Sequence, residues 1–272
     1  MKGTDQFQHE SISAFKFGYA PFGKPKLFVH LYFVDGLLID TGQKAMAKEI
    51  LATTAQLPVK QMFITHHHED HTGNISEIQK QHQCLVYAPP LTSEMMKNPP
   101  RLSFAQKAVY GSRPSYSHLK PISGNLETPN HSFELIPIPG HAIDMVALYE
   151  RNKGWLFSAD LYINKFIGYF LKGENIGQQI ESTKKILGLD FESLFCAHNP
   201  QLKNGKQALQ EKLDFLEDFY QKVQSKYDIG KSAKTIFKEL NLKEDSLIKL
   251  LSGGLLSKLN MVESVLESIR QD

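Results

Sequence analysis

The chain has 272 residues, enough for one large domain or for one domain with a small appendage. Its net charge is +2 and the charges are balanced on both sides of residue 200, which argues against a nucleic-acid partner and against anionic membranes. Two cysteines, Cys84 and Cys196, are too few for a disulfide framework. The first ten residues lack the apolar stretch of a signal peptide, and no run reaches the roughly 20 apolar residues of a membrane span. We therefore expect a cytoplasmic protein without a membrane partner.

The first ninety residues predict strands that give way to alternating strands and helices. Residues 26–34 are rich in aromatic and β-branched side chains, Asp35-Gly36 is a turn signal, and residues 37–40 form a short apolar strand. This order indicates sheets that are covered by helices. The elements that follow are a helix over 43–56, a strand over 61–64, a helix over 72–81 and a strand over 84–88.

Residues 89–131 interrupt this alternation. They contain several prolines, one predicted helix from about Thr92 to Val109, and a polar loop. We interpret the segment as an insertion over one edge of the fold, and a lid is one role that is open to it. Strands resume over 133–136, 145–149, 155–157 and 193–196.

Beyond residue 203 the pattern is helical only. Apolar residues from Leu209 to Val223 recur on one helix face, and Ser232 is a candidate cap for a helix that runs to Leu240. Further helices are predicted over 245–251 and 255–269, separated by Gly253-Gly254. We expect a catalytic domain of residues 1–202 and a helical subdomain of residues 203–272. The last apolar helix would pack on its own core or form a homodimer.

A cluster of metal-binding residue types lies between the strand at 61–64 and the helix at 72–81. It reads Thr65-His66-His67-His68-Glu69-Asp70-His71-Thr72-Gly73-Asn74, on a strand-to-helix loop, where functional groups usually lie. Imidazole suits zinc and related ions, and carboxylate adds a harder ligand. In an extended segment His66 and His68 point to the same side and can share one ion. Asp70 and His71 then begin a turn and can face a second ion, whereas His67 points away and is expected to be exposed.

Two ions need more ligands than this cluster supplies. Three further candidates each follow a predicted strand: His141 after Ile138-Pro139-Gly140, Asp160 after Leu156-Phe157-Ser158-Ala159, and His198 after Leu194-Phe195-Cys196-Ala197. A single His or Asp after a strand is more often structural than a ligand. Together, and in this order, the three favour a metal site.

These residues resemble the metallo-β-lactamase superfamily. The motif of that family is His-x-His-x-Asp-His, followed downstream by a His, an Asp and a His, and all of them are present here in order. Leu38-Ile39-Asp40-Thr41-Gly42 also matches a segment that the family carries near its start. The similarity covers about residues 25–200. The stretch from Thr65 to Asn74 is especially similar to glyoxalase II-type hydrolases.

The resemblance implies an α+β fold, the four-layer αββα sandwich, with metals at one edge between the sheets. Asp40 would support the site by orienting a ligand or the motif loop, and its simpler role is to cap the turn before Thr41-Gly42. Zinc is the ion that the ligand types favour, with iron and manganese as alternatives. The implied cofactors are two divalent metal ions, with His66, His68 and His141 on the first, Asp70, His71 and His198 on the second, and Asp160 bridging both.

Two positions depart from the family pattern. The last histidine lies in Ala197-His198-Asn199-Pro200, where many relatives have Gly-His-Gly, so this loop is stiffer and bulkier. Ala159 likewise stands where relatives often have Gly.

The expected chemistry follows from the metals. Two bound ions lower the pKa of a shared water to near neutral, which produces hydroxide without a dedicated protein base. Asp70 is the catalytic candidate, because it can orient the hydroxide or accept its proton. The reaction is then addition of hydroxide to a carbonyl or phosphoryl centre.

The favoured substrate is a small ester, either a thioester or a lactone, and an acyl-CoA ester or a lactone fits as well as a glutathione thioester. Glyoxalase II-type relatives bind glutathione through basic and tyrosyl groups, and Lys165 and Tyr169 are loosely placed for this. Tyr162, Asn164 and Phe166 are further pocket candidates, although packing against the C-terminal helices explains them equally well. The alternatives are a phosphodiesterase or ribonuclease, against which the near-neutral charge counts, and a metal-binding module without turnover.

Overall fold

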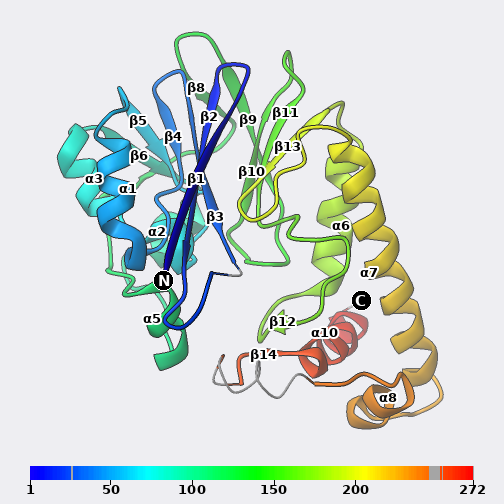
Figure 1. Cartoon of the computed structure of the whole chain (residues 1–272). Coiled ribbons are helices and arrows are strands. Elements are labelled where there is room, and N and C mark those ends of the chain that lie inside the picture. The colour runs from blue at the N-terminus through cyan, green and yellow to red at the C-terminus, as the bar shows by residue number, and fades with distance from the viewer. Residues whose placement is uncertain (26, 245–251, 253, 272) are drawn as a thin grey trace.

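Two sheets form the centre of the molecule in this computed structural model, which describes residues 1–25, 27–244, 252 and 254–271 (Figure 1). The predicted helix over 245–251 and Gly253 lie outside the described residues. The first sheet runs antiparallel from β1 to β4 and parallel from β4 to β7. In order it contains β1 (Lys2–His9), β2 (Ile12–Tyr19), β3 (Val29–Val34), β4 (Leu37–Ile39), β5 (Gln61–Phe63), β6 (Leu85–Ala88) and β7 (Lys120–Pro121).

The second sheet is assembled from the later half of the fold. Its strands are antiparallel except for β11 and β13, which pair in parallel. In order it contains β13 (Ser193–Cys196), β11 (Trp155–Ala159), β10 (Val146–Glu150), β9 (Ser132–Pro137) and β8 (Asn125–Glu127).

The layers follow from strands that are apolar on both faces. Successive residues of a strand point to opposite faces. Leu31 therefore shares a core with Ile50 of the outer helix α1 (Ala47–Thr54), whereas Tyr32 packs edge-on against Phe157 and Phe195 of the second sheet. The outer face of the first sheet is also covered by the 3-10 turn η1 (Lys44–Met46) and by α3 (Ile75–His82).

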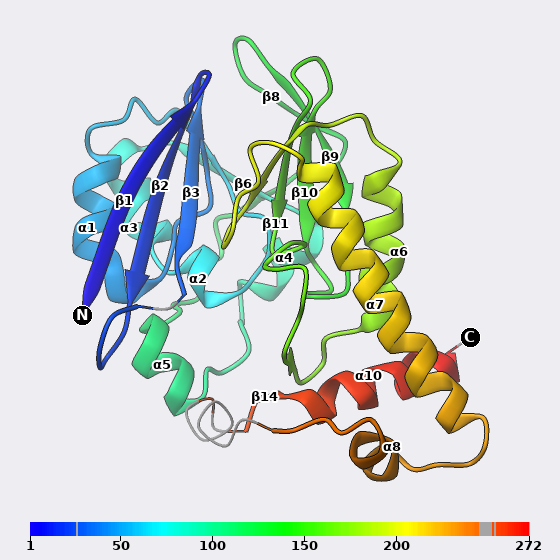
Figure 2. The same cartoon turned by 45° about the vertical axis from the view of Figure 1, so that its right-hand side comes forward.

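Two helices cover the outer face of the second sheet. Leu156 of β11 shares a core with Ile186 of α6 (Ile176–Leu187) and with Leu209 of α7 (Gly205–Tyr227). The order is thus helix, sheet, sheet, helix (Figure 2), and the predicted αββα sandwich is confirmed. The sequence analysis missed α6, whose N-terminus is capped by Asn175 through a hydrogen bond from the backbone N of Gln178.

The segment 89–131 differs from its prediction. The single helix expected from Thr92 to Val109 was wrong, because Pro99-Pro100 separates α4 (Pro90–Met95) from α5 (Phe104–Tyr110). The expected polar loop contains β7 and β8, which extend the two sheets. Whether the segment moves as a lid stays a prediction.

The C-terminal region is helical and packs on the sandwich. It contains α7, α8 (Ala233–Glu239) and α10 (Lys258–Gln271), and the helix expected from residue 255 is preceded by the strand β14 (Leu256–Ser257), which pairs with β12 (Phe170–Leu171). Val262 and Val265 of α10 share one core with Leu216 of α7 and Ile176 of α6. The division at residue 202 and the homodimer stay proposals. Within the chain, the apolar face of α10 is buried against α6 and α7. In the described ranges no helix is both long and apolar enough to span a membrane.

Candidate metal centre

The loop that carries the His-rich segment leaves β5 at Phe63 and is held by Asp40. The Asp40 carboxylate accepts hydrogen bonds from the backbone N and the hydroxyl of Thr65, both at 2.9 Å. The short helix α2 (Glu69–Thr72) begins directly after His68, so the chain turns there. This turn places His71 beside Asp40, with 2.7 Å between His71 Nδ1 and Asp40 Oδ2.

The second sheet supplies three side chains at the same edge. His141 lies in the loop after β9, Asp160 directly follows β11, and His198 comes two residues after β13. Gly140 has a φ of +133°, and a Cβ there would lie 2.5 Å from the backbone N of Gln179 in α6. Only glycine therefore lets the His141 loop lie this close to the helix.

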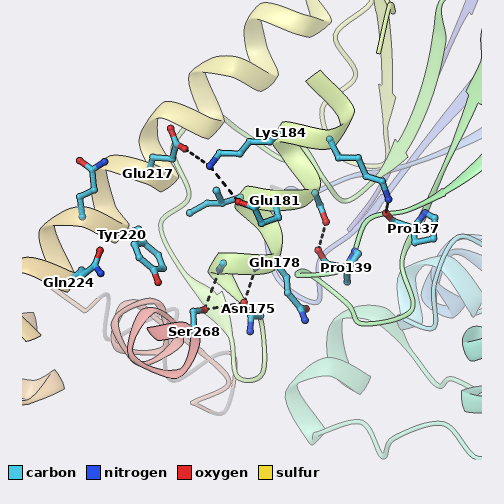
Figure 3. A pocket seen from close by; sticks show the side chains of 15 residues that line it. Pro137, Pro139, Asn175, Gln178, Glu181, Lys184, Glu217, Tyr220, Gln224 and Ser268 are labelled. Carbon is cyan, nitrogen blue, oxygen red and sulfur yellow. Dashed lines mark hydrogen bonds and ion pairs between the residues drawn. The ribbon is translucent and has the colours of Figure 1, made fainter. Parts of the chain in front are cut away.

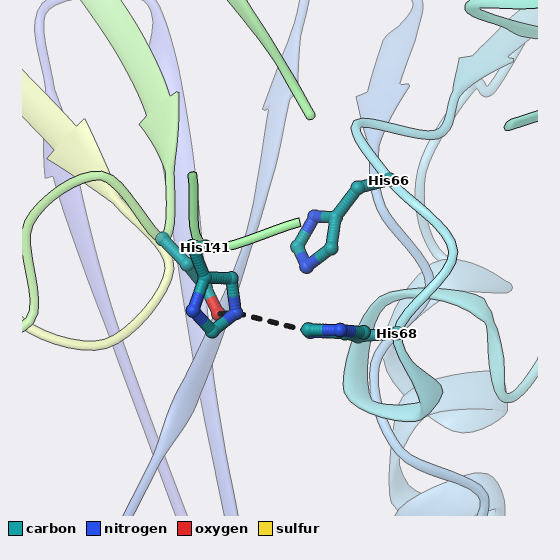
Figure 4. A group of neighbouring side chains, drawn as sticks. His66, His68 and His141 are labelled. Atoms are coloured by element: carbon teal, nitrogen blue, oxygen red, sulfur yellow. Dashed lines mark hydrogen bonds and ion pairs between the residues drawn. The ribbon is translucent and has the colours of Figure 1, made fainter. Parts of the chain in front are cut away.

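Two groups of side chains meet where these loops face each other, and they share Asp160. In each group, one candidate ligand atom per residue lies within 4.8 Å of all the others. Figure 4 shows the imidazoles of His66, His68 and His141 converging, with 3.0 Å between His141 Nε2 and His68 Nδ1. The first group is His66, His68, His141 and Asp160, and the second is Asp70, His71, Asp160 and His198, so all seven predicted positions come together.

Partners on the far side of the rings orient two histidines of the second group. Asp40 contacts Nδ1 of His71, and His198 Nδ1 donates to the carbonyl oxygen of Phe28 at 2.7 Å. In both cases Nε2 is the nitrogen left to face the group. A carboxylate or carbonyl behind a metal-binding imidazole has this effect in metal sites generally.

Glu174 plays the same part for the first group, and sequence reasoning missed it. Its Oε2 lies 3.5 Å from His141 Nδ1 and accepts a hydrogen bond from Gln179 Nε2 at 2.8 Å. Its Oε1 accepts from the backbone N of Leu171 at 2.9 Å. The residue lies in the loop before α6 and has no sequence signal, because a lone Glu there resembles an ordinary exposed acid.

Three buried polar atoms of the centre have no hydrogen bond. They are Nε2 of His66, Nε2 of His71 and Oδ1 of Asp160, from side chains that are at most 3% exposed. His71 Nε2 and Asp160 Oδ1 lie 3.2 Å apart without the geometry of a hydrogen bond. Buried polar atoms are normally satisfied. Unsatisfied imidazole nitrogens and carboxylate oxygens in one place fit a divalent metal ion.

The electrostatics of the centre favour a cation beside its carboxylates. Burial and the neighbouring imidazoles lower the pKa values of His66 and His68 well below their ordinary value, so both rings are neutral at pH 7. Burial raises the pKa of Asp160, but His198 and His71 outweigh it and hold that pKa well below its usual range. Burial lowers the pKa of His71, and the carboxylates around it outweigh burial and raise it. Ionised carboxylates that face one another in this way favour a cation between them.

His67 was expected to be exposed, and it is buried. Asp144 accepts from the backbone N of His67 at 2.9 Å and lies 2.8 Å from its Nδ1, and Thr92 of α4 donates to the same carboxylate at 2.8 Å. Arg113 donates to the carbonyl oxygen of His67 at 2.9 Å and lies 3.6 Å from Glu69. The motif loop is thus tied to the segment 89–131.

A cavity of about 540 Å³ opens onto both groups. Its walls come from α5, from the segment that follows Asp160, and from the residues around β14. Of the predicted pocket residues, Asn164, Phe166 and Tyr169 line it. Tyr162 lies outside, because its side chain is buried in the core beneath the second sheet. Lys165 also lies outside, since its ammonium group is 3.6 Å from Glu211 of α7.

A larger cavity of about 890 Å³ lies elsewhere, between α6, α7 and α10 (Figure 3). None of the seven candidate ligands lines it. Three of its charged side chains pair with one another, since Lys184 lies 3.0 Å from Glu217 and 3.4 Å from Glu181. Lys185 donates to the carbonyl oxygen of Pro137 at 3.1 Å. Size alone therefore does not mark the functional site.

Known proteins with similar sequences also indicate a metal-dependent hydrolase. Residues 26–198 match the family model of the metallo-beta-lactamase superfamily. Hydroxyacylglutathione hydrolases of Salmonella paratyphi A (strain ATCC 9150 / SARB42) and Salmonella newport (strain SL254) are each 27% identical over 192 residues, which cover 69% of this chain and 67% of the relative. These relatives confirm the predicted resemblance to glyoxalase II-type hydrolases.

Solved structures share the fold over most of the chain. A metallo-beta-lactamase family protein from Thermus thermophilus is 17% identical, with a TM-score of 0.69 over 96% of this chain and 93% of the other. A beta-lactamase domain protein from Burkholderia ambifaria is 13% identical, with a TM-score of 0.69 over 97% of this chain and 88% of the other. A flavoprotein from Thermotoga maritima is 15% identical, with a TM-score of 0.60 over 89% of this chain and 70% of the other. The chain therefore belongs to the metallo-beta-lactamase superfamily and is a metal-dependent hydrolase.

Proposed function

We propose that the chain hydrolyses a small carbonyl ester, a thioester or a lactone, with two divalent ions held by its two groups of side chains. The observation that carries this proposal is the sharing of Asp160 between the groups, at the floor of a 540 Å³ cavity. A cavity of this size accommodates a small molecule.

Each residue has a role in the proposal. His66, His68 and His141 would hold the first ion, Asp70, His71 and His198 the second, and Asp160 both. Asp40 and Glu174 orient the imidazoles of His71 and His141 from behind. Two bound divalent ions supply a nucleophile at neutral pH and polarise the substrate carbonyl.

Asp70 is proposed as the catalytic residue. It lines the cavity and also belongs to the second group, with its Oδ2 3.5 Å from His198 Nε2. Its carboxylate is therefore placed where it could contact both a water at the second group and a substrate in the cavity. It can orient that water and accept its proton as the oxygen adds to the carbonyl carbon.

The relatives suggest the thioester class. The hydroxyacylglutathione hydrolases act on an acyl thioester of glutathione, and a lactone offers the same carbonyl chemistry. We propose zinc as the ion, because the ligand set is dominated by imidazole. Elemental analysis of the purified protein distinguishes zinc from iron and manganese.

The test is a parallel assay of metal-loaded protein on thioester, lactone and phosphodiester substrates. Asp160→Ala removes the shared ligand and should lower turnover about 10³-fold or more, equivalent to about 4 kcal/mol, and reduce the metal content from two ions per chain. Asp214→Ala, an exposed carboxylate on α7, is the matched control and should change neither. Cleavage of the phosphodiester alone would overturn the proposal.

A further inference from the structure

The walls of the 540 Å³ cavity carry information about the substrate, and the inference drawn from them rests on the proposed function. The floor of the cavity is polar, because the two ligand groups lie there. The walls are mainly apolar, and three separate segments supply them. Their apolar side chains include Val109 of α5, Ile163 and Ile167 after Asp160, Leu171 of β12, and Leu255 and Leu256 at β14.

The charged side chains that line the cavity are acidic, apart from the histidines. Among the described residues no lysine or arginine lines it; the acids are Glu69, Asp70, Asp160 and Glu174. Three cations near the cavity already have partners. Arg113 pairs with Glu69, and Lys165 lies over the ring of Phe166 and beside Glu211. Lys258 lies over the ring of Tyr169. Within the described part of the wall, an anionic group of a substrate would thus meet no side-chain cation.

Two apolar side chains remain exposed at the same cavity. Phe166 is 62% exposed and Leu27, in the connection between β2 and β3, is 40% exposed, and both line the cavity. Phe166 is steadied by an edge-on contact with Phe215 of α7 at 5.6 Å. Exposed apolar side chains that gather around an opening are typical of a binding site for an apolar group.

We propose that the substrate is a thioester or lactone with an apolar acyl chain and an uncharged leaving group. Burying an unpaired carboxylate or phosphate is strongly unfavourable, whereas each buried methylene improves binding about fourfold. With a lactone, water oxygen adds to the acyl carbon, the ring carbon–oxygen bond breaks, and the products are one hydroxy carboxylate and one proton. With a thioester, water oxygen adds to the acyl carbon and the carbon–sulfur bond breaks. The products are a carboxylate, a thiol and one proton. Glutathione and coenzyme A thioesters, which carry several anionic groups, are therefore poor substrates.

The first experiment compares acyl thioesters of N-acetylcysteamine, from acetyl to decanoyl, with glutathione and coenzyme A thioesters of the same acids. We expect kcat/KM to rise about fourfold per methylene until the cavity is filled. The neutral decanoyl thioester should exceed its glutathione counterpart by about tenfold or more. Equal rates along the series, or preference for glutathione, would overturn this inference and leave the proposed function intact.

Binding separates the two ideas further. A non-hydrolysable analogue, N-acetyl-N′-decanoylethylenediamine, in which an amide NH replaces the thioester sulfur, is titrated calorimetrically into the metal-loaded protein. Apolar burial should give a negative heat-capacity change. Binding without turnover of any ester would support the apolar cavity and overturn the proposed function, and the absence of both would overturn both.

A variant pair tests the role of charge directly. Val109 lines the cavity and is half-buried, so the lysine of Val109→Lys can extend its ammonium group to the opening. This change should raise kcat/KM for the glutathione thioester about tenfold relative to the neutral one. Ala108→Lys adds the same charge on the exposed side of α5 and should leave the ratio unchanged. The same ratio in both variants, with matching thermal melts, would contradict the proposal.

Discussion

The metal-binding edge and the wall of the cavity differ in origin. The candidate ligands lie just beyond strands of the two sheets, on loops or, for Asp70 and His71, on the short helix α2. Asp40 and Glu174 support His71 and His141 from behind. The wall comes from α5, from the segment that follows Asp160, and from Ser252, Leu255 and Leu256, which lie outside both sheets. Chemistry thus depends on the sandwich, whereas selectivity depends on segments that can change without disturbing it.

Asp40→Ala should have the largest effect and tests whether the metal-binding edge works as a unit. His71 and the backbone N of Thr65 lose a buried acceptor, so we expect metal affinity to fall about 10- to 100-fold and unfolding free energy to fall by about 3 kcal/mol. Metal titration and thermal denaturation measure both. Asp40 has a φ of +62°, so Asp40→Asn, which tolerates that conformation, is the control. Unchanged metal content in Asp40→Ala would show that the metal-binding edge does not depend on Asp40.

Glu174→Gln tests a residue that both supports His141 and lines the cavity. The variant keeps the size of the side chain and removes the carboxylate behind His141, so metal affinity should fall about tenfold. Competition with a chelator measures the change, and Glu181→Gln on the exposed side of α6 is the control. A change in substrate preference with full metal affinity would assign Glu174 to the wall alone.

Lys212→Met tests a buried contact between the sandwich and the helical region. Lys212 of α7 donates to the carbonyl oxygen of Leu161 and to Gln179, and burial lowers its pKa from 10.5 to about 8. Below pH 8 Lys212 is protonated in both the folded and the unfolded protein, and the folded protein bears the full cost of burying the charge, about 3 kcal/mol. Between pH 8 and 10.5 the unfolded state binds more protons, so the unfolding free energy rises with pH.

Thermal melts of wild type and Lys212→Met from pH 7 to 10 measure this difference. The melting temperature of wild type should rise relative to the variant across that window. Parallel curves would show that the ammonium group of Lys212 titrates as it does in water.

Phe166→Ala should have the smallest effect and acts on the wall alone. Phe166 is 62% exposed, so stability should change by less than about 0.5 kcal/mol. For long acyl esters KM should rise about threefold, with kcat and metal content unchanged. A fall in metal content would contradict the separation of the two regions.

The metal-binding edge could be predicted from the sequence because its signal is local. Four of the seven positions lie within His66 to His71, and the other three each follow an apolar strand. The wall could not, because nothing in a loop sequence determines the direction of its side chains. Phe166 faces the cavity while Tyr162, four residues earlier, is buried in the core. His67 was misjudged for a similar reason, since its partner Asp144 is distant in sequence.

The pairing of β14 with β12 also has a consequence for synthesis of the chain. All seven candidate ligands have left the ribosome once residue 198 is exposed, yet Leu255 and Leu256 follow more than fifty residues later. Contacts between distant parts of a sequence form late in folding. The nascent chain therefore contains all seven candidate ligands before the last part of the cavity wall has been synthesised.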